Sequence, residues 1–533
     1  MDKVQQRFLS VLGAGALFCC AAPAGPRFYP DDPLWTSPPP LAVKHPHKRK
    51  INELYDFAIN SLATPGEHWT RPGQHPIPAQ GVNTLGEVFD NDWYTNRHYW
   101  HPMTLEELRR GPARGNEPVP PFQIVGAKSE GITPGFQIKD ARGRRFLCKP
   151  DPMSNPEMAT AADVIGSKFF YAFGYNTPEN YIFYFTRKDL SISPDARITP
   201  KGGKERAMNA GDLDRVLRLM PRDGEGRYRM MASLFIPGEG IGPFRWYGVR
   251  SDDPNDIYRH EHRRDLRGLY VFCAWLNHTD VKANNTYDTV ITENGAPVIR
   301  HYLIDFGASL GSDSDAPKDA RFGHEFMVEK DRKVILKTFD LGLYSPAWER
   351  ARFPDLPAAG HFEAETFDPD CWTSNYPNAA FMNRLPDDTF WAAKQVMAFS
   401  DAEIRAIVET GQFTDRRAAD YIAKTLIARR DKIGRVFFAK VLPLDRFAVQ
   451  DSELRFEDLA VKYGFAAPRS YEVRWFRFNN DTGERTPIAH TGTAVPQNAG
   501  AYLAAEIRAA GAGAPSVTVY LRGSKVVGID RTW

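Results

Sequence analysis

The spacing of hydrophobic positions changes several times along the chain and divides it into regions. Short stretches in which apolar and polar residues alternate predict strands between residues 121 and 238. Residues 251–276 and 400–430 have apolar positions every three or four residues, which predicts helices. Alternation returns between residues 441 and 533. We therefore expect a β-rich unit, an α-rich unit and a small β-sandwich-like unit, in that order.

Lys149 ends a predicted hairpin of two strands, residues 136–139 and 144–149. Phe146 and Cys148 flank it on the second strand, so a charged side chain stands in apolar surroundings. Burying an unpaired charge is costly, and an inward-directed Lys149 therefore needs an anionic partner. The alternative is that Lys149 lies exposed at the end of its strand.

A long helix is predicted after this hairpin, with Asn155 as its N-cap and Gly174 at its end. At about 100° per residue, most of its apolar positions share one face. Glu157 lies at the edge of that face, and Asp163 points to the opposite side. We therefore predict an ion pair between Glu157 and Lys149, with Asp163 facing solvent. The alternative makes Glu157 only a first-turn acid that the helix dipole favours.

Residues 277–307 have the clearest chemical pattern in the chain. A loop that contains Asp280 and Asn285 leads into a predicted hairpin, whose turn is an Asn-Gly pair. The return strand ends at Asp305. This order of loop, hairpin and acidic loop places two carboxylates and one amide side chain at the same end of a small sheet.

Phosphoryl transfer requires such a set of side chains. One carboxylate orients the acceptor hydroxyl, while a second carboxylate and an amide oxygen hold Mg²⁺ against the phosphates. Asp280 fits the first role, and Asn285 and Asp305 fit the metal-binding role. Lys282, two residues after Asp280, would steady the charge of the γ-phosphate. The alternative is a structural turn, rich in Asp and Asn, that leads into a buried strand.

These residues resemble the protein-kinase signature His-Arg-Asp, followed by Asn and then by Asp-Phe-Gly. Here the first triplet reads His-Thr-Asp and ends at Asp280, and the second begins at Asp305. The resemblance implies ATP and Mg²⁺ (or Mn²⁺), a hydroxyl acceptor, and a catalytic ion pair between Lys149 and Glu157. In kinases the Arg pairs with a phosphate on the activation loop. Because Thr279 replaces it, that mode of regulation is not expected.

The same resemblance assigns a nucleotide site. The segment from Gly126 to Gly131, which includes Lys128, takes the place of the glycine-rich loop that covers the phosphates in kinases. It lacks the Gly-x-Gly-x-x-Gly pattern, so its glycines fit a simple turn equally well. A Pro-Gly break follows Ile236, where a kinase has its hinge. Main-chain groups from Ser233 to Ile236 would therefore meet adenine.

Several features separate the chain from standard protein kinases, among them the missing Ala-Pro-Glu end of the activation segment and the Lys-Pro pair at 149–150. It resembles atypical kinases instead: HipA-type Ser/Thr kinases, phosphoinositide kinases and exported CotH-type kinases. The resemblance implies an α+β fold with two lobes. The β-rich N-lobe with its long helix would span residues 121–238 and the α-rich C-lobe residues 239–440, before an all-β accessory domain at 441–533.

Residues 1–24 read as an export signal. Lys3 and Arg7 precede an apolar run that is too short to span a bilayer comfortably. The sequence around Cys20 resembles a lipoprotein box, so a lipid anchor at Cys20 is an alternative to simple cleavage after residue 24. Export places the protein in the periplasm or cell envelope, where ATP is scarce.

A Pro-rich arm follows at residues 25–120. It carries a basic cluster at 45–50 and a predicted short helix in which Leu54, Phe57, Ala58 and Leu62 share a face. Over the whole chain, 68 Lys and Arg against 66 Asp and Glu leave a net charge of +2. That balance gives no support to a nucleic-acid partner or to an anionic membrane.

Three functions from different classes remain open on the sequence. The first is an exported atypical kinase, and the second is a pseudokinase that binds a nucleotide or another ligand without transfer. The third is a cell-envelope interaction protein that acts through the C-terminal β-domain. Scarce extracellular ATP favours the last two. The intact set of Lys149, Glu157, Asp280, Asn285 and Asp305 favours the first, because binding alone does not need all five.

Overall fold

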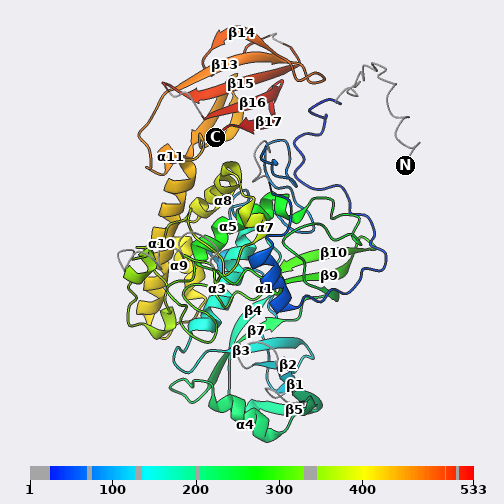
Figure 1. Cartoon of the computed structure of the whole chain (residues 1–533), viewed down its shortest axis with the longest axis vertical. Helices are drawn as coiled ribbons and strands as arrows, with labels where there is room; N and C mark the ends of the chain where they lie inside the picture. The colour runs from blue at the N-terminus through cyan, green and yellow to red at the C-terminus, as the bar shows by residue number, and fades with distance from the viewer. Residues whose placement is uncertain are drawn as a thin grey trace, which may run out of the picture.

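The computed structural model describes residues 25–68, 75–127, 135–198, 204–328, 345–497, 500–511 and 515–533. Three blocks follow one another along its long axis, and Figure 1 shows them from bottom to top as a β-rich block, a helical block and a second β-rich block. The fold is mixed α/β. Among the described residues, no helix is long and apolar enough to cross a membrane.

The first block is a seven-stranded sheet with the order β4-β7-β3-β2-β1-β5-β6. Its neighbours pair antiparallel, except that β1 and β5 run parallel. The strands are β1 Phe122–Ala127, β2 Phe136–Lys139, β3 Arg145–Pro150, β4 Asn180–Phe185, β5 Leu190–Ile198, β6 Arg206–Ala207 and β7 Tyr228–Leu234. Their inward side chains form one apolar core with α4, Ala210–Arg218. Gly126 lies inside β1 and not in a turn, contrary to the prediction, because β1 continues to Ala127.

The long helix of this block, α3, spans Met158–Phe173. It begins later than predicted, because Glu157 takes a left-handed backbone conformation with φ of 69° and acts as the N-cap residue. The helix ends at Gly174, as expected. A side chain at Gly174 would overlap the ring of Tyr94, so glycine is required there. Nearly every residue of α3 is buried, since the helix lies between the sheet and the helical block.

The helical block consists of helices around a shared apolar core and a three-stranded sheet with the order β10-β9-β8. The helices are α5 Arg264–Leu276, α7 Ala379–Met382, α8 Pro386–Ala398, α9 Asp401–Glu409 and α10 Arg416–Phe438. The strands are β8 Glu239–Gly242, β9 Thr286–Glu293 and β10 Ala296–Leu303. The predicted hairpin is β9–β10, and both turn residues, Asn294 and Gly295, have the positive φ that a two-residue hairpin turn requires.

The C-terminal block contains a strand pair, β11 Leu444–Gln450 with β12 Glu453–Asp458, and a short helix, α11 Leu459–Lys462. A five-stranded antiparallel sheet follows, with the order β14-β13-β15-β16-β17. Its strands are β13 Tyr471–Phe478, β14 Arg485–Thr491, β15 Tyr502–Ala509, β16 Ser516–Arg522 and β17 Lys525–Arg531. Side chains of the strand pair and of the larger sheet share one core. The predicted domain boundaries stay predictions.

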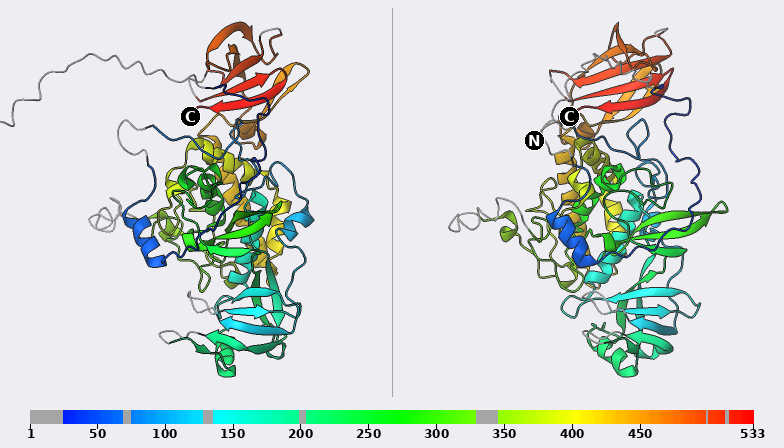
Figure 2. Two further views of the ribbon diagram at one scale, coloured as in Figure 1. Left: turned by 90° about the vertical axis from the view of Figure 1, so that its right-hand side faces the viewer. Right: turned by 45° about the vertical axis from the view of Figure 1, so that its right-hand side comes forward.

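The Pro-rich arm contacts both the C-terminal sheet and the helical block. Figure 2 shows it running down the molecule from the C-terminal sheet. At the sheet, Arg27 pairs with Asp530, and Phe28 packs its ring against Tyr520. Further along, the Arg49 amide donates to the carbonyl of Ile241 at 2.7 Å, on β8. The arm contains α1, Glu53–Leu62, and α2, Leu105–Arg110.

Candidate active site

Lys149 on β3 lies between two carboxylates that come from different parts of the fold. Its Nζ is 3.3 Å from Asp163 Oδ2 on α3 and 2.5 Å from Asp305 Oδ1, just after β10. The other oxygen of Asp163 accepts from the Phe306 amide at 3.1 Å and from Asn180 Nδ2 at 3.2 Å. Asp163 therefore connects the strand lysine directly to the Asp-Phe-Gly loop.

The predicted ion pair between Lys149 and Glu157 is wrong. Glu157 precedes α3 and turns toward the helical block, where both of its carboxylate oxygens accept from Thr414, one from the amide at 2.8 Å. Asp163, which was expected in solvent, has 2% of its surface exposed. The periodicity gave the wrong side because α3 is covered on both sides. The composition of α3 could have indicated the correct partner of Lys149, since Asp163 is the only acid in this mostly apolar helix of 16 residues.

The electrostatics of this cluster favour a charged lysine. Burial lowers the pKa of Lys149, but Asp163 and Asp305 more than offset it and raise the pKa above its ordinary value. Burial has the opposite effect on Asp163 and raises its pKa, while Lys149 lowers it. One ammonium between two carboxylates leaves the cluster short of positive charge, so the site favours an additional cation.

The predicted catalytic loop brings Asp280, Lys282 and Asn285 together. Asn285 Nδ2 donates to the Asp280 carbonyl at 2.7 Å and to its carboxylate at 3.0 Å, and Lys282 Nζ is 3.3 Å from the same carboxylate. The amide of Ile304 donates to the Asn285 carbonyl at 3.0 Å, which joins this loop to the strand before Asp305. Asp305 has a φ of 63°, a strained conformation that is common at functional sites.

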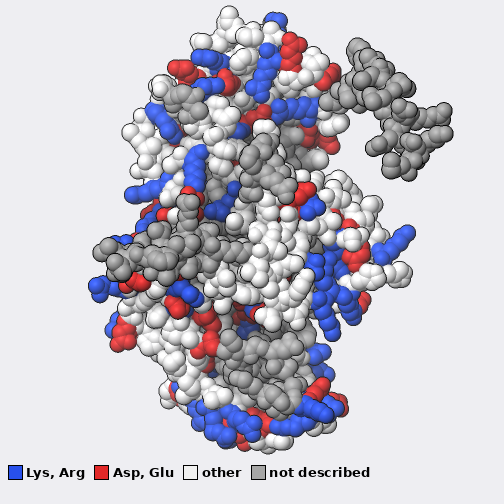
Figure 3. Space-filling model, in the orientation of Figure 1, with Lys and Arg blue, Asp and Glu red and all other residues white. Residues whose placement is uncertain are grey.

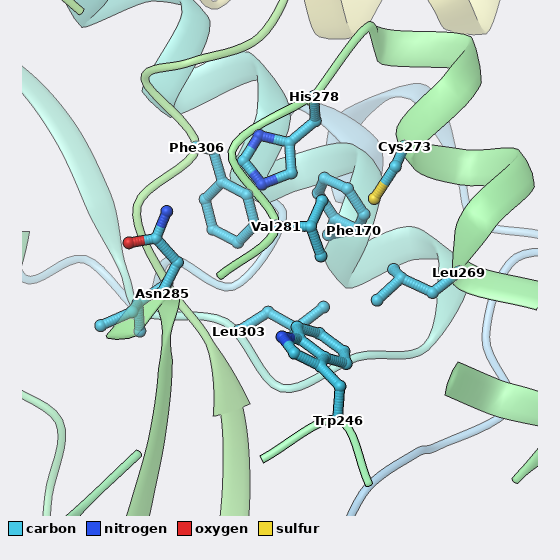
Figure 4. A pocket seen from close by; sticks show the side chains of 10 residues that line it. Phe170, Trp246, Leu269, Cys273, His278, Val281, Asn285, Leu303 and Phe306 are labelled. Atoms are coloured by element: carbon cyan, nitrogen blue, oxygen red, sulfur yellow. The ribbon is translucent and has the colours of Figure 1, made fainter. Parts of the chain in front are cut away.

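His278, two residues before Asp280, anchors the loop with a buried side chain. Its ring packs beside Phe170 and Phe306, with ring centroids 5.7 and 6.0 Å away, and Figure 4 shows this apolar surrounding. Burial lowers the pKa of His278 to about 4, so the ring is neutral near pH 7. The cavity drawn in Figure 4 holds only about 10 Å³, the room of a single water molecule, and is therefore part of the packing.

The residue that replaces the kinase arginine also has a partner. Lys318 is fully buried; its Nζ donates to Thr279 Oγ1 at 2.9 Å and lies 3.5 Å from Asp313 Oδ1. Burial lowers the pKa of Lys318, against the attraction of Asp313 and Asp280. Lys318 thus contacts the loop that carries Asp280 from inside the same chain, through the side chain of Thr279.

A cavity of about 210 Å³ opens beside Lys149, Asp163 and Asp305. Its remaining lining is mostly apolar and comes from the seven-stranded sheet, the segment after β7, β9 and the end of β10: Leu147, Pro178, Asn180, Met231, Ser233, Leu234, Phe235, Ile236, Tyr287 and Ile304. Ser233 and Ile236 thus line this cavity, and their contact with adenine stays a prediction. Lys128 and Gly131 lie outside the described residues.

The side-chain oxygens of Asn285 and Asp305 are of the kind that Mg²⁺ prefers; Asp305 lines this cavity, and Asn285 lies in the loop that is hydrogen-bonded to the residue before it, Ile304. Asn285 uses its amide nitrogen to bind Asp280, so its amide oxygen is the atom that would ligate a cation. Mg²⁺ is commonly bound by one or two protein oxygens together with substrate phosphates. The described ranges hold no group of three or more His, Cys, Asp or Glu residues that could bind a metal by themselves.

Replacing Asp163 by Asn should weaken nucleotide binding by about tenfold to a hundredfold, because Lys149 loses one charged partner and an amide nitrogen faces its ammonium. Titration with a fluorescent ADP analogue measures this. Glu157→Gln is the matched control and should leave the affinity within about twofold. A loss of affinity in Glu157→Gln but not in Asp163→Asn would show that the partner has been misidentified.

Comparison with known proteins adds little to this geometry. No protein-family model and no curated protein matches the chain. Among solved structures, the Golgi casein kinase with Mn/ADP bound aligns with a TM-score of 0.29 and 9% identity, over 62% of this chain and 73% of that one. A second structure of the Golgi casein kinase gives 0.27 and 8% over the same shares. Both are kinases, but likeness at this level identifies no family for the chain.

Proposed function

We propose that the protein is an atypical kinase that transfers the γ-phosphate of ATP to a hydroxyl acceptor. One observation carries this proposal. Lys149, Asp163 and Asp305 meet at the edge of a cavity, and the backbone of Asn285 ties the loop of Asp280 to the strand that ends at Asp305. Phosphoryl transfer depends on positioning and charge, and this arrangement supplies both.

The apolar part of the cavity suits a purine, and its polar end suits phosphates. Lys149 is held in a fixed position by two carboxylates, so its charge is already oriented when a nucleotide enters. A divalent cation held by Asn285 and Asp305 would neutralise phosphate charge. The proposed metal is Mg²⁺ or Mn²⁺.

Asp280 is the proposed base. In the transfer, the acceptor oxygen forms a bond to the γ-phosphorus, the bond between that phosphorus and ADP breaks, and the acceptor proton passes late to the Asp280 carboxylate. Asn285 and Lys282 both contact this carboxylate and thereby hold it in place. Lys282 is also the proposed partner of the transferred phosphate.

The metal assignment predicts that nucleotide stabilises the wild type in a thermal-shift measurement only when Mg²⁺ or Mn²⁺ is present. Asp305→Ala should abolish this metal-dependent shift, because it removes the carboxylate proposed to hold the cation. Circular dichroism serves as the control for folding of the variant. A shift with ATP alone that neither the metal nor the substitution changes would contradict the assignment.

Asp280→Asn should reduce phosphoryl transfer by about 10²–10⁴-fold with little change in nucleotide affinity, because the amide keeps the size of the side chain but cannot accept the proton. The assay is transfer of labelled γ-phosphate by purified residues 25–533. A wild type that binds nucleotide but transfers no phosphate with any divalent metal would instead be a pseudokinase. A wild type that binds no nucleotide would favour the interaction protein.

We also propose that the protein is exported and that residues 1–24 are removed, or that the chain is lipidated at Cys20. The support is the basic and apolar pattern of the N-terminus. Intact-mass analysis of the native protein should therefore find Gly25 as the first residue, or a lipid on Cys20. A native protein that retains Met1 would contradict export by this route.

A further inference from the structure

Helix α1 of the arm exposes part of its apolar surface to solvent, while Phe57, Ala58 and Ile59 are half-buried. It buries Asp56, Asn60 and Ser61, whereas Leu54, Tyr55 and Leu62 have 76%, 60% and 68% of their surface exposed. Leu54 and Leu62 lie about two turns apart on one stripe of the helix. A surface helix normally has the reverse arrangement, so an exposed apolar stripe of this kind indicates a binding surface.

The buried side of α1 explains why the helix nevertheless stays in place. Asp56 accepts from the Tyr376 hydroxyl at 3.1 Å, and Asn60 donates to the Asp56 carbonyl at 2.8 Å. The hydrogen bond from Tyr376 to Asp56 and the packing of the Phe57 ring on Tyr376, with ring centroids 5.6 Å apart, thus hold the helix against the helical block. The apolar stripe of Leu54, Tyr55 and Leu62 is not used in this attachment.

The N-terminal end of α1 lies beside the proposed catalytic loop. Glu53, the first residue of α1, pairs with Lys282 at 2.7 Å, and Asn284 Nδ2 donates to the carbonyl of Ile51 at 3.3 Å. Lys282 in turn contacts Asp280. Figure 1 shows α1 on the front of the helical block, next to β9. A polypeptide bound along α1 would therefore extend toward the proposed base.

A basic segment leads directly into α1. Lys44, Lys48 and Lys50 are exposed, and Arg245 is exposed nearby. Burial and the neighbouring Arg250 and Arg245 lower the pKa of Arg49, with opposition from Asp288 and Asp252. Figure 3 shows Lys and Arg side chains gathered beside the position of α1. Positive charge concentrated at one place attracts an anionic partner.

We propose that the apolar stripe of α1 and the basic segment 44–50 together bind the phosphate acceptor, and that this acceptor is a polypeptide with acidic residues next to an apolar segment. The inference rests on the proposed kinase function and adds its substrate class. Apolar side chains of the acceptor cover Leu54, Tyr55 and Leu62, acidic side chains meet the lysines, and the acceptor hydroxyl reaches Asp280.

The test uses residues 25–533 and three serine-containing peptides of equal length. One combines Glu and Leu residues, the second has Gln in place of Glu, and the third has Ser in place of Leu. Fluorescence anisotropy measures peptide binding in the presence of Mg²⁺ and a non-hydrolysable ATP analogue. The first peptide should bind at least about tenfold more tightly than either of the others.

Two double variants separate the apolar and the charged contributions. Leu54→Ser with Leu62→Ser should remove the preference for Leu, and Lys44→Glu with Lys50→Glu should remove the preference for Glu. Each loss is expected to be about tenfold. Lys48 is left in place because it pairs with Glu239 at 3.0 Å. The matched control, Arg215→Glu with Arg218→Glu, alters exposed charges on α4 at the far end of the N-lobe and should leave peptide binding unchanged.

Nucleotide affinity, measured in the same samples, distinguishes this inference from the proposed function. Peptide preference without phosphate transfer would overturn the kinase and keep the docking surface. Transfer or nucleotide binding without any preference among the peptides would overturn the docking surface. Loss of binding to anionic vesicles in either variant, with unchanged peptide affinity, would assign the stripe to a membrane. A change in sedimentation coefficient alone would assign it to self-association.

Discussion

The charge of Lys149 is the constraint on which the site depends. A lysine that is 12% exposed on a central strand is stable only with anionic partners, and the partners come from α3 and from the end of β10. The sheet, the long helix and the β9–β10 hairpin therefore have to meet at one point. Asp163 reinforces this junction, because it also accepts from the Phe306 amide. The same cluster stabilises the fold and prepares a charged site at the edge of the cavity.

The proposed catalytic loop is held on two sides. On the inner side, Lys318 binds Thr279, and the neutral ring of His278 packs against Phe306. From outside, the arm pairs Glu53 with Lys282. The loop is thus held on both sides by contacts within its own chain.

The arm also connects the blocks at a distance from the site. Lys394 on α8 is buried and pairs with Glu87 of the arm and with Asp445 of β11, at 2.5 and 3.1 Å. Breaking a buried pair of this kind costs several kcal/mol, since it leaves a charge without its partner. The strand pair β11–β12 of the C-terminal block is therefore attached to the helical block by polar contacts in which the arm takes part.

The sequence by itself determined the features that depend on local spacing. The alternation around Lys149, the Asn-Gly turn of the β9–β10 hairpin and the short loop from Asp280 to Asn285 are set by neighbouring residues, and the structure contains all three. Only the tertiary structure decided which acid meets Lys149. Helical periodicity assumes one buried face, but α3 is covered on both sides. Asp163 is therefore buried and pairs with Lys149, whereas Glu157 contacts Thr414. The tertiary structure also decided how α1 is oriented. Asp56 on its buried side accepts a hydrogen bond from Tyr376, and this orientation leaves Leu54 and Leu62 exposed.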